Sequence, residues 1–370
     1  MESLLLLLLV PIGWPFIAKA VWGHEYTFQE LALNIVVACV IASGVWYAGR
    51  YVQMRDVEII NGAVIGKSRE TVSCSHSYSC RCTTNSKGQK SCSTCYRHSN
   101  DYDWVLRTNV GPNIEVSRVD SQGSTEPGRY RRAQVGDPVA VENAYENYVK
   151  ASAGSLFHDK GSVLTNLPVP AYPNTVFDYH YVNRALAVGV TVPDLAQWNL
   201  DIANALRQLG PSKQVNFVVV FAGTSQTSYA QALEREWVGG KKNDVIVVLG
   251  TPKYPELSWV RVLSWTDREK FKVGLRDELL DMKVVDRSAV MAALTTATAA
   301  SYQRKSMKDF EYLKYDIEPP VWVLILAFVL SAGTSVGLSR YFSKHDVTFA
   351  GVLAVLIGAG TAALVFRRRK

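Results

Sequence analysis

The sequence predicts an α+β membrane protein in which four transmembrane helices, two at each end, flank a soluble body. Two observations support this prediction. The apolar residues of the 370-residue chain gather in long runs at both ends, whereas the middle has the mixed composition of a soluble protein. That middle begins with a β-rich part containing a dense cysteine cluster and continues with alternating apolar strands and amphipathic helices. These features exclude a simple cytosolic enzyme and a disordered chain.

Four apolar runs have the length of membrane helices. A helix that crosses the hydrocarbon core needs about 20 mostly apolar residues. The runs contain no acidic residue, and they cover about residues 4–22, 31–49, 321–338 and 347–366. The absence of an ionisable residue near the middle of any run argues against a pump or an ion pathway.

The first run has a second interpretation as a cleaved signal peptide. Residues 18–20 (Ala-Lys-Ala) resemble a signal-peptidase site that follows an apolar segment. However, the residues before the run carry no positive charge, and Pro11 and Pro15 interrupt it. A retained membrane helix is therefore the favoured interpretation, and cleavage is left open.

Positive charge predicts the side of the membrane on which the body lies. With an even number of helices, both chain ends and the soluble body share one side. Most lysines and arginines close to the runs belong to that side: Arg50, Arg55, Arg304, Lys305, Lys308, Lys314 and residues 367–370. The positive-inside rule therefore predicts a cytoplasmic body, with a bacterial inner membrane as the expected location.

Small residues recur every four positions in two runs, which predicts close helix packing within a bundle or between copies of the chain. One run has Ala327, Ser331, Ser335 and Ser339, and the other has Ala350, Ala354, Gly358 and Ala362. A weaker stripe in the second run consists of Asn34, Ala38 and Ala42.

The chain divides into four expected parts: membrane helices in 1–49 and 319–370, a β-rich module in 50–180 and an α/β domain in 181–318. In the β-rich module, the Asn61-Gly62 pair predicts a hairpin between two short strands. In the α/β domain, apolar segments predict strands at 185–192, 215–222, 244–249 and 259–265. Helical spacing appears at 194–209, 225–237, 267–280 and 287–303.

The α/β domain resembles the TPM domain family over about residues 191–302. The resemblance rests on an apolar strand, a helix ending in Glu236-Trp237, then Gly239, and Asn243-Asp244 before a second apolar strand. It implies an α/β sandwich, often tethered to a membrane, with metal binding and phosphatase activity reported in the family. Val245 stands where the family usually has glycine, which weakens the transfer of that activity. The whole layout is also similar to multi-pass membrane proteins of bacteria and tailed phages.

The cysteine cluster is the sharpest chemical signal, because five of the six cysteines fall between residues 74 and 98. Two pairs, Cys80/Cys82 and Cys92/Cys95, flank a polar loop, and zinc favours four sulfur or nitrogen ligands. These four cysteines are the predicted ligands of a structural zinc ion. Cys74, His76 and His98 are reserve ligands.

Two alternatives to the zinc site stay open. A disulfide framework needs an oxidising compartment, against the charge bias, and leaves one of the five cysteines unpaired. Reactive thiols are the other alternative, although no cysteine is marked as activated. The surrounding basic residues suit anionic lipid, nucleic acid or a simple solvated surface.

The sequence has no P-loop, no G-x-G-x-x-G after a strand, no H-E-x-x-H and no G-x-S-x-G, so no catalytic residue is assigned. Asp194, Asp201 and Asp244 are candidates for a ligand-binding sheet edge, with helix capping as the simpler role for Asp194. We expect a scaffold that recruits other proteins at the cytoplasmic face. The alternative is a membrane-tethered metal-dependent phosphatase or hydrolase that uses the TPM-like domain. His158 and His180 are isolated and are given no catalytic role.

Overall fold

The computed structural model describes residues 2–86, 88–155, 165–174, 176–177, 180–181, 183–346 and 367–368. The chain forms two compact units. The first consists of Met1–Asp56, Glu146–Ser155 and Phe310–Lys370, and the second of Val57–Tyr145 and Leu156–Asp309. The fourth expected membrane helix, with its stripe of small residues, lies outside the described residues, as does His158.

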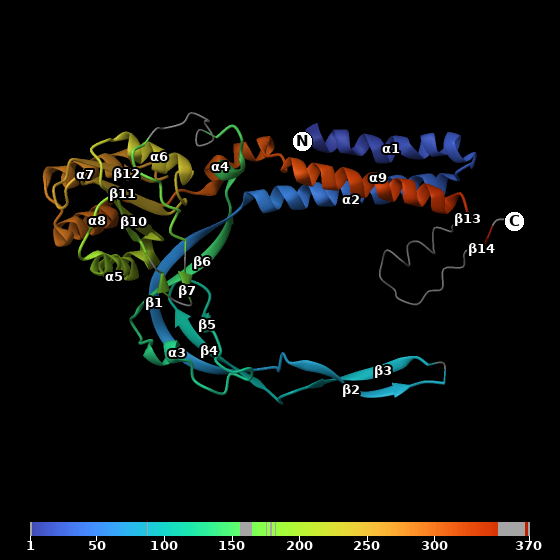
Figure 1. Ribbon diagram of the computed structural model, residues 1–370, viewed down its shortest axis with the longest axis horizontal. Coiled ribbons are helices and arrows are strands. Elements are labelled where there is room, and N and C mark those ends of the chain that lie inside the picture. The colour runs from blue at the N-terminus through green and yellow to red at the C-terminus, as the bar shows by residue number, and fades with distance from the viewer. Residues whose placement is uncertain are drawn as a thin grey trace. The chain divides into compact units, whose positions relative to one another are not determined.

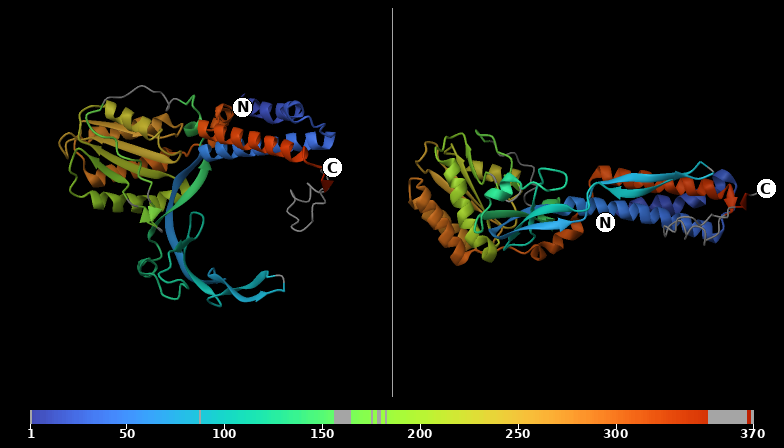
Figure 2. Two further views of the ribbon diagram at one scale, coloured as in Figure 1. Left: turned by 45° about the vertical axis from the view of Figure 1, so that its right-hand side comes forward. Right: turned by 90° about the horizontal axis from the view of Figure 1, so that it is seen from below.

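Among its described residues, the first unit contains three helices that are long and apolar enough to cross a membrane: α1 (Glu2–Trp22), α2 (Phe28–Met54) and α9 (Val321–Phe342). They lie side by side in both views (Figures 1 and 2). The N-terminus of α2 is fixed by a capping box, in which Thr27 and Glu30 each bond the other's backbone N–H. Shorter elements of this unit are α4 (Tyr148–Ala151), β13 (His345–Asp346) and β14 (Arg367–Arg368).

The small-residue stripe of α9 faces α2, as the four-residue spacing predicts. Ala327, Ser331, Ser335 and Ser339 are all buried. Opposite them lies Asn34, whose side-chain amide donates to the Ser335 carbonyl oxygen (3.0 Å) and to the Ser339 hydroxyl (2.7 Å). Close approach of small residues and a buried hydrogen bond both favour helix association in lipid. This face is therefore used inside the bundle, and association between copies stays a prediction.

A four-stranded antiparallel sheet forms the first part of the second unit. Its order is β5-β4-β1-β6, with β1 at Arg55–Val72, β4 at Asp101–Thr108, β5 at Ile114–Val116 and β6 at Pro138–Glu146. The short helix α3 (Gly128–Arg132) packs Tyr130 into the same core as Trp104 and Leu106.

The hairpin expected at Asn61-Gly62 is wrong, because β1 runs straight through both residues. Asn61 is buried and donates through its amide to the Val215 carbonyl oxygen (3.0 Å) and the Asn216 side chain (3.2 Å). Gly62 lies against Asn109 and Val110, which leave no room for a Cβ. Contacts with residues far along the chain thus hold Asn61 and Gly62 in a strand, although the pair alone would favour a turn.

The second part of the unit is a four-stranded sheet of order β12-β11-β10-β9. The strands are β9 (Ala185–Val188), β10 (Asn216–Ala222), β11 (Asp244–Gly250) and β12 (Trp259–Leu263). β9, β10 and β11 are parallel, and β12 is antiparallel to β11. The strands predicted from apolar segments are confirmed within a few residues at their ends.

Helices cover both faces of this sheet (Figure 1). On one face lie α5 (Leu195–Lys213), α7 (Glu269–Asp281) and α8 (Arg287–Ser301). On the other face lies α6 (Ser228–Glu236). Alternate residues of β10 serve the two faces: Phe217, Val219 and Phe221 meet the first group, and Val218 and Val220 meet α6. Double coverage explains why the central strands are apolar at successive positions. Further short elements are β7 (Val176–Phe177) and β8 (His180–Tyr181). A 3-10 helix at Met307–Asp316 begins in the second unit and ends in the first.

Candidate functional site

The cysteine window folds into an isolated two-stranded ribbon made of β2 (Ser77–Thr84) and β3 (Lys90–Tyr96). The chain enters the ribbon from β1 and leaves it into β4 (Figure 1). β1 and β4 are themselves paired, and their pair nearest the ribbon in sequence is Val72 opposite Asp101. Nearly all described side chains of the ribbon are exposed. The ribbon therefore contributes almost nothing to a hydrophobic core.

Two disulfide bonds cross the ribbon, Cys80–Cys95 and Cys82–Cys92. They join the four residues expected to bind zinc. The structure thus differs from the expected tetrathiolate site, because a sulfur in a disulfide is not a thiolate ligand. The difference has a physical reason in the strand pairing, which places cysteines of β2 beside cysteines of β3 and leaves the four sulfurs bonded in pairs.

A β-bulge sets this pairing. Cys80 lies opposite Ser93 and Thr83 opposite Ser91, so Arg81 and Cys82 together face Cys92. Arg81 has a φ of 45°, the left-handed conformation that occurs at the first position of one type of bulge. The extra residue brings Cys82 level with Cys92.

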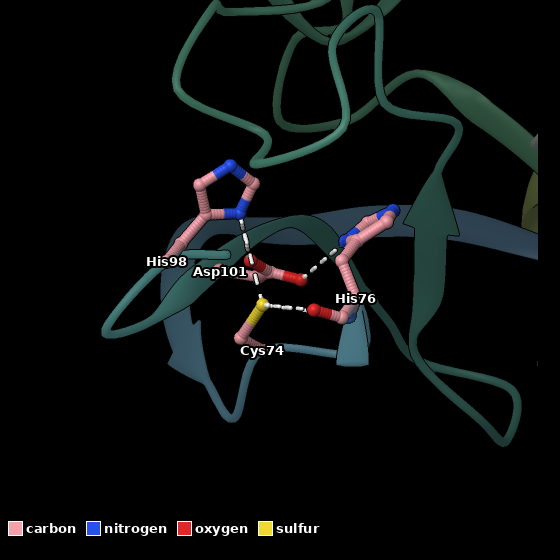
Figure 3. A group of neighbouring side chains, drawn as sticks. All are labelled: Cys74, His76, His98 and Asp101. Carbon is pink, nitrogen blue, oxygen red and sulfur yellow. Dashed lines mark hydrogen bonds and ion pairs between the residues drawn. The ribbon is translucent and has the colours of Figure 1, made fainter. Parts of the chain in front are cut away.

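The three reserve ligands converge at the base of the ribbon, where they meet Asp101. Cys74 and His76 lie between β1 and β2, whereas His98 and Asp101 lie between the end of β3 and the start of β4. The ligand atoms of the four residues lie within 4.8 Å of one another. Figure 3 shows the two imidazole rings on either side of the Asp101 carboxylate, with the Cys74 sulfur below it.

Three distances define the cluster. The Cys74 sulfur is 3.7 Å from His98 Nδ1, which is 3.1 Å from Asp101 Oδ1. His76 Nδ1 is 3.5 Å from Asp101 Oδ2. Cys74 and Asp101 are buried, and the two histidines are partly exposed.

Asp101 is fully buried but surrounded by donors. Its Oδ2 accepts from the Ser75 backbone N–H and from Arg118 Nη1, each at 3.1 Å. Burial alone would raise the pKa of this carboxyl. The hydrogen bonds from Ser75, His98, Cys74 and Arg118 outweigh burial and hold its pKa well below the usual value. Asp101 is therefore an ionised buried carboxylate.

Sequence reasoning missed Asp101 because it considered only cysteines and histidines. One signal was available: residues 71–100 contain no acid, and Asp101 is the first acid after the cysteine window. An acid three residues after His98, at the start of a strand, is in range to share a ligand set.

The aspartates expected as candidates for a ligand-binding sheet edge make other contacts. Asp244 has no exposed surface, and its carboxylate accepts from the Tyr172 hydroxyl (2.7 Å), the Lys241 N–H (2.8 Å) and the Asn216 amide (2.9 Å). Burial raises its pKa to about 6 against these three bonds. A carboxylate enclosed in this way is poorly placed to reach a substrate.

Asp194 lies at the N-cap position of α5, as expected, but makes no capping hydrogen bond. Its carboxylate pairs with Arg287 (2.8 Å), which also pairs with Asp201 (3.0 Å). The two acids thus share one arginine and link α5 to α8. The side chain of His180 lies outside the described residues.

No family model, curated protein or solved structure matches this chain. Within its described residues the chain has three helices able to span a membrane and a second unit that carries a disulfide-bonded ribbon. A cluster of cysteine, histidine and aspartate able to hold a metal ion adjoins that ribbon.

Proposed function

We propose that this protein is a membrane-anchored scaffold that presents the β2–β3 ribbon to a partner protein. One observation carries the proposal: an exposed ribbon with almost no core is braced by two disulfide bonds. A lone two-stranded hairpin is at best marginally stable in water. Two cross-links that close loops of 15 and 10 residues make it stiff without making it part of the core.

The ribbon suits recognition of an acidic, extended segment of a protein. As a two-stranded sheet, its outer edges carry backbone groups that an added strand can pair with. Arg81, Lys90 and Arg97 are exposed, and the stretch 71–100 contains no acid. Tyr78 and Tyr96 are also exposed, at 49% and 58%, and add contact area. Anionic lipid and nucleic acid share the charge preference but would not use the strand edges.

We place the body in an oxidising compartment, in contrast to the cytoplasmic location expected from charge. Disulfides form and persist in such compartments. The positive-inside rule is weakest for a body of this length, because long segments translocate largely regardless of charge. Mass measurement of the protein purified without reductant tests this: four oxidised cysteines support the placement, and six free thiols return the body to the cytoplasm.

The remainder of the scaffold fits the same role. A structural zinc ion in the cysteine region would stiffen the base from which the ribbon extends.

We retain the TPM-like assignment of residues 191–302 as part of the proposal, supported by the parallel strands β9–β11 between two layers of helices. The hydrolase alternative loses support because Asp244 is enclosed by protein groups.

Photo-crosslinking in host cells tests the recruitment role. A crosslinking amino acid replaces Thr94, exposed on the ribbon, or Lys253, exposed on the α/β domain as a matched control. We expect a discrete protein adduct at position 94 that disappears when Arg81→Glu and Lys90→Glu are added. Adducts that are identical at both positions, or unchanged by charge reversal, would contradict the proposal.

A further inference from the structure

We infer that Cys74, His76, His98 and Asp101 form a zinc site at the base of the ribbon, separate from the four disulfide cysteines. The inference does not depend on the recruitment role, since a zinc ion can stabilise the fold whatever the ribbon binds.

Three separations within the cluster are close to those of a tetrahedral zinc centre. Bonds of about 2.3 Å to sulfur and about 2.1 Å to nitrogen or oxygen place ligand atoms about 3.3–3.6 Å apart. The observed separations are 3.7 Å from sulfur to His98 Nδ1, 3.1 Å from that atom to Asp101 Oδ1, and 3.5 Å from His76 Nδ1 to Asp101 Oδ2. All four ligand atoms lie within 4.8 Å of one another, so modest side-chain movement would bring them onto one ion.

The donor set selects the class of metal. One thiolate, two imidazoles and one carboxylate are the ligand types that zinc accepts in proteins. Calcium and magnesium prefer oxygen ligands throughout, so this set disfavours both. The two histidines use Nδ1 toward the cluster, and each ring keeps its other nitrogen for an outward hydrogen bond.

The charges around the cluster balance when zinc is bound. A zinc ion with the Cys74 thiolate and the Asp101 carboxylate is neutral as a group. Arg118, which pairs with Asp101, also pairs with Asp103 at 2.5 Å, so its charge stays compensated when Asp101 binds zinc. Arg118 and the Ser75 N–H hold Asp101 Oδ2, which orients the carboxylate so that Oδ1 points toward His98. Such outer contacts typically fix the ligands of a metal site.

The site explains how the loops at the ribbon base are fixed. Cys74 and His76 lie in the segment between β1 and β2, and His98 and Asp101 lie in the segment from the end of β3 to the start of β4. One ion bound by both segments would close the base of the ribbon, below the disulfide at Cys80–Cys95.

The test uses the full-length oxidised protein in detergent, stripped with a chelator and titrated with zinc against a chromogenic competitor. We expect about one tight site per chain. Cobalt in its place should give the visible spectrum of a tetrahedral ion and a sulfur-to-cobalt charge-transfer band. Changes outside the ligand shell already weaken zinc sites by about 10–100-fold, so His76→Ala should weaken binding by more than that. Cys74→Ser should also remove the charge-transfer band.

Two controls separate this site from other cysteines. Cys39→Ser removes the remaining free cysteine, and Cys82→Ser with Cys92→Ser removes one disulfide. Both variants should keep the ion and its spectrum. A wild-type protein that binds no zinc would overturn the inference. Zinc binding that survives both Cys74→Ser and His76→Ala but is lost in the Cys82/Cys92 variant would also overturn it, and would place the metal on the ribbon.

Discussion

The α/β sheet and the ribbon region of the second unit are stabilised in different ways. Strands β10 and β11 are buried along their whole length between two layers of helices. The ribbon β2–β3 is exposed along almost its whole length and is held by two covalent bonds. Apolar burial stabilises the first region, whereas cross-links restrict the unfolded chain in the second.

Three acids, Asp101, Asp120 and Asp244, show a similar contrast. Asp101 and Asp120, next to the ribbon and in the loop after β5, have lowered pKa values. Burial would raise the pKa of Asp101, but Ser75, His98, Cys74 and Arg118 outweigh it, and the Thr125 N–H is the main donor to Asp120. Asp244, in the α/β sheet, has a raised pKa because burial outweighs its three donors. Hydrogen bonds thus favour the charged form of Asp101 and Asp120, whereas burial disfavours the charged form of Asp244.

The largest expected effect is the difference in stability lost when one aromatic side chain is truncated in each region. Phe221→Ala removes a ring with no exposed surface that packs edge-on against Trp198 at 5.0 Å. We expect a loss of about 3–5 kcal/mol in the free energy of unfolding. Tyr96→Ala removes a ring that is 58% exposed and should change it by less than about 0.5 kcal/mol. Chemical denaturation in detergent measures both, and equal losses would show that the ribbon shares the core.

The α/β half could be predicted from sequence because its signals are local. Continuous apolar segments at 215–222 and 244–249 indicate strands covered on both faces, and helical spacing indicates the covering helices. The structure places β10 and β11 there. The α9 stripe was predictable for the same reason, since a four-residue spacing on a helix defines one face.

The ribbon half was harder to predict because its structure depends on partners far along the chain. Asn61-Gly62 favours a turn locally, but Asn61 hydrogen-bonds to Asn216 and the pair lies within β1. Sequence spacing did not decide between zinc and disulfides for Cys80, Cys82, Cys92 and Cys95, because either needs only that the two strands meet. The bulge at Arg81, which aligns Cys82 with Cys92, has no sequence signal.

A pH profile of stability should sharpen the contrast between the acids. The folded-state pKa of Asp244 is about 6, above the value of about 3.9 in an unfolded chain. Its contribution to stability is therefore complete below about pH 3.9 and is lost as pH rises through about 6. About two pKa units correspond to a loss of up to about 3 kcal/mol. Asp244→Asn should flatten the profile between about pH 4 and 6.

Asp120→Asn is the matched control, because the pKa of Asp120 is lowered in the folded protein whereas that of Asp244 is raised. The Thr125 and Ser124 backbone N–H groups lower the folded-state pKa of Asp120. Its contribution is present above the unfolded value of about 3.9 and is lost as pH falls through the lower folded value. The variant's profile should run parallel to that of the wild type, at lower stability, between about pH 4 and 6, and the two should converge below that range. Identical profiles for both variants would contradict the opposite roles of the acids.

The smallest expected effect concerns backbone strain at the ribbon bulge. Arg81 adopts a φ of 45°, which glycine adopts without steric penalty and a β-branched residue adopts only with strain. Arg81→Gly should stabilise the ribbon against local opening by about 0.5–1 kcal/mol, and Arg81→Val should destabilise it. Both substitutions remove the same charge, so the difference between them isolates the backbone. Hydrogen exchange of ribbon amides measures the opening, and amides of β11 should not change in either variant. Faster ribbon exchange in Arg81→Gly than in Arg81→Val would show that the bulge is not in this conformation, and the alignment of Cys82 with Cys92 would then need another cause.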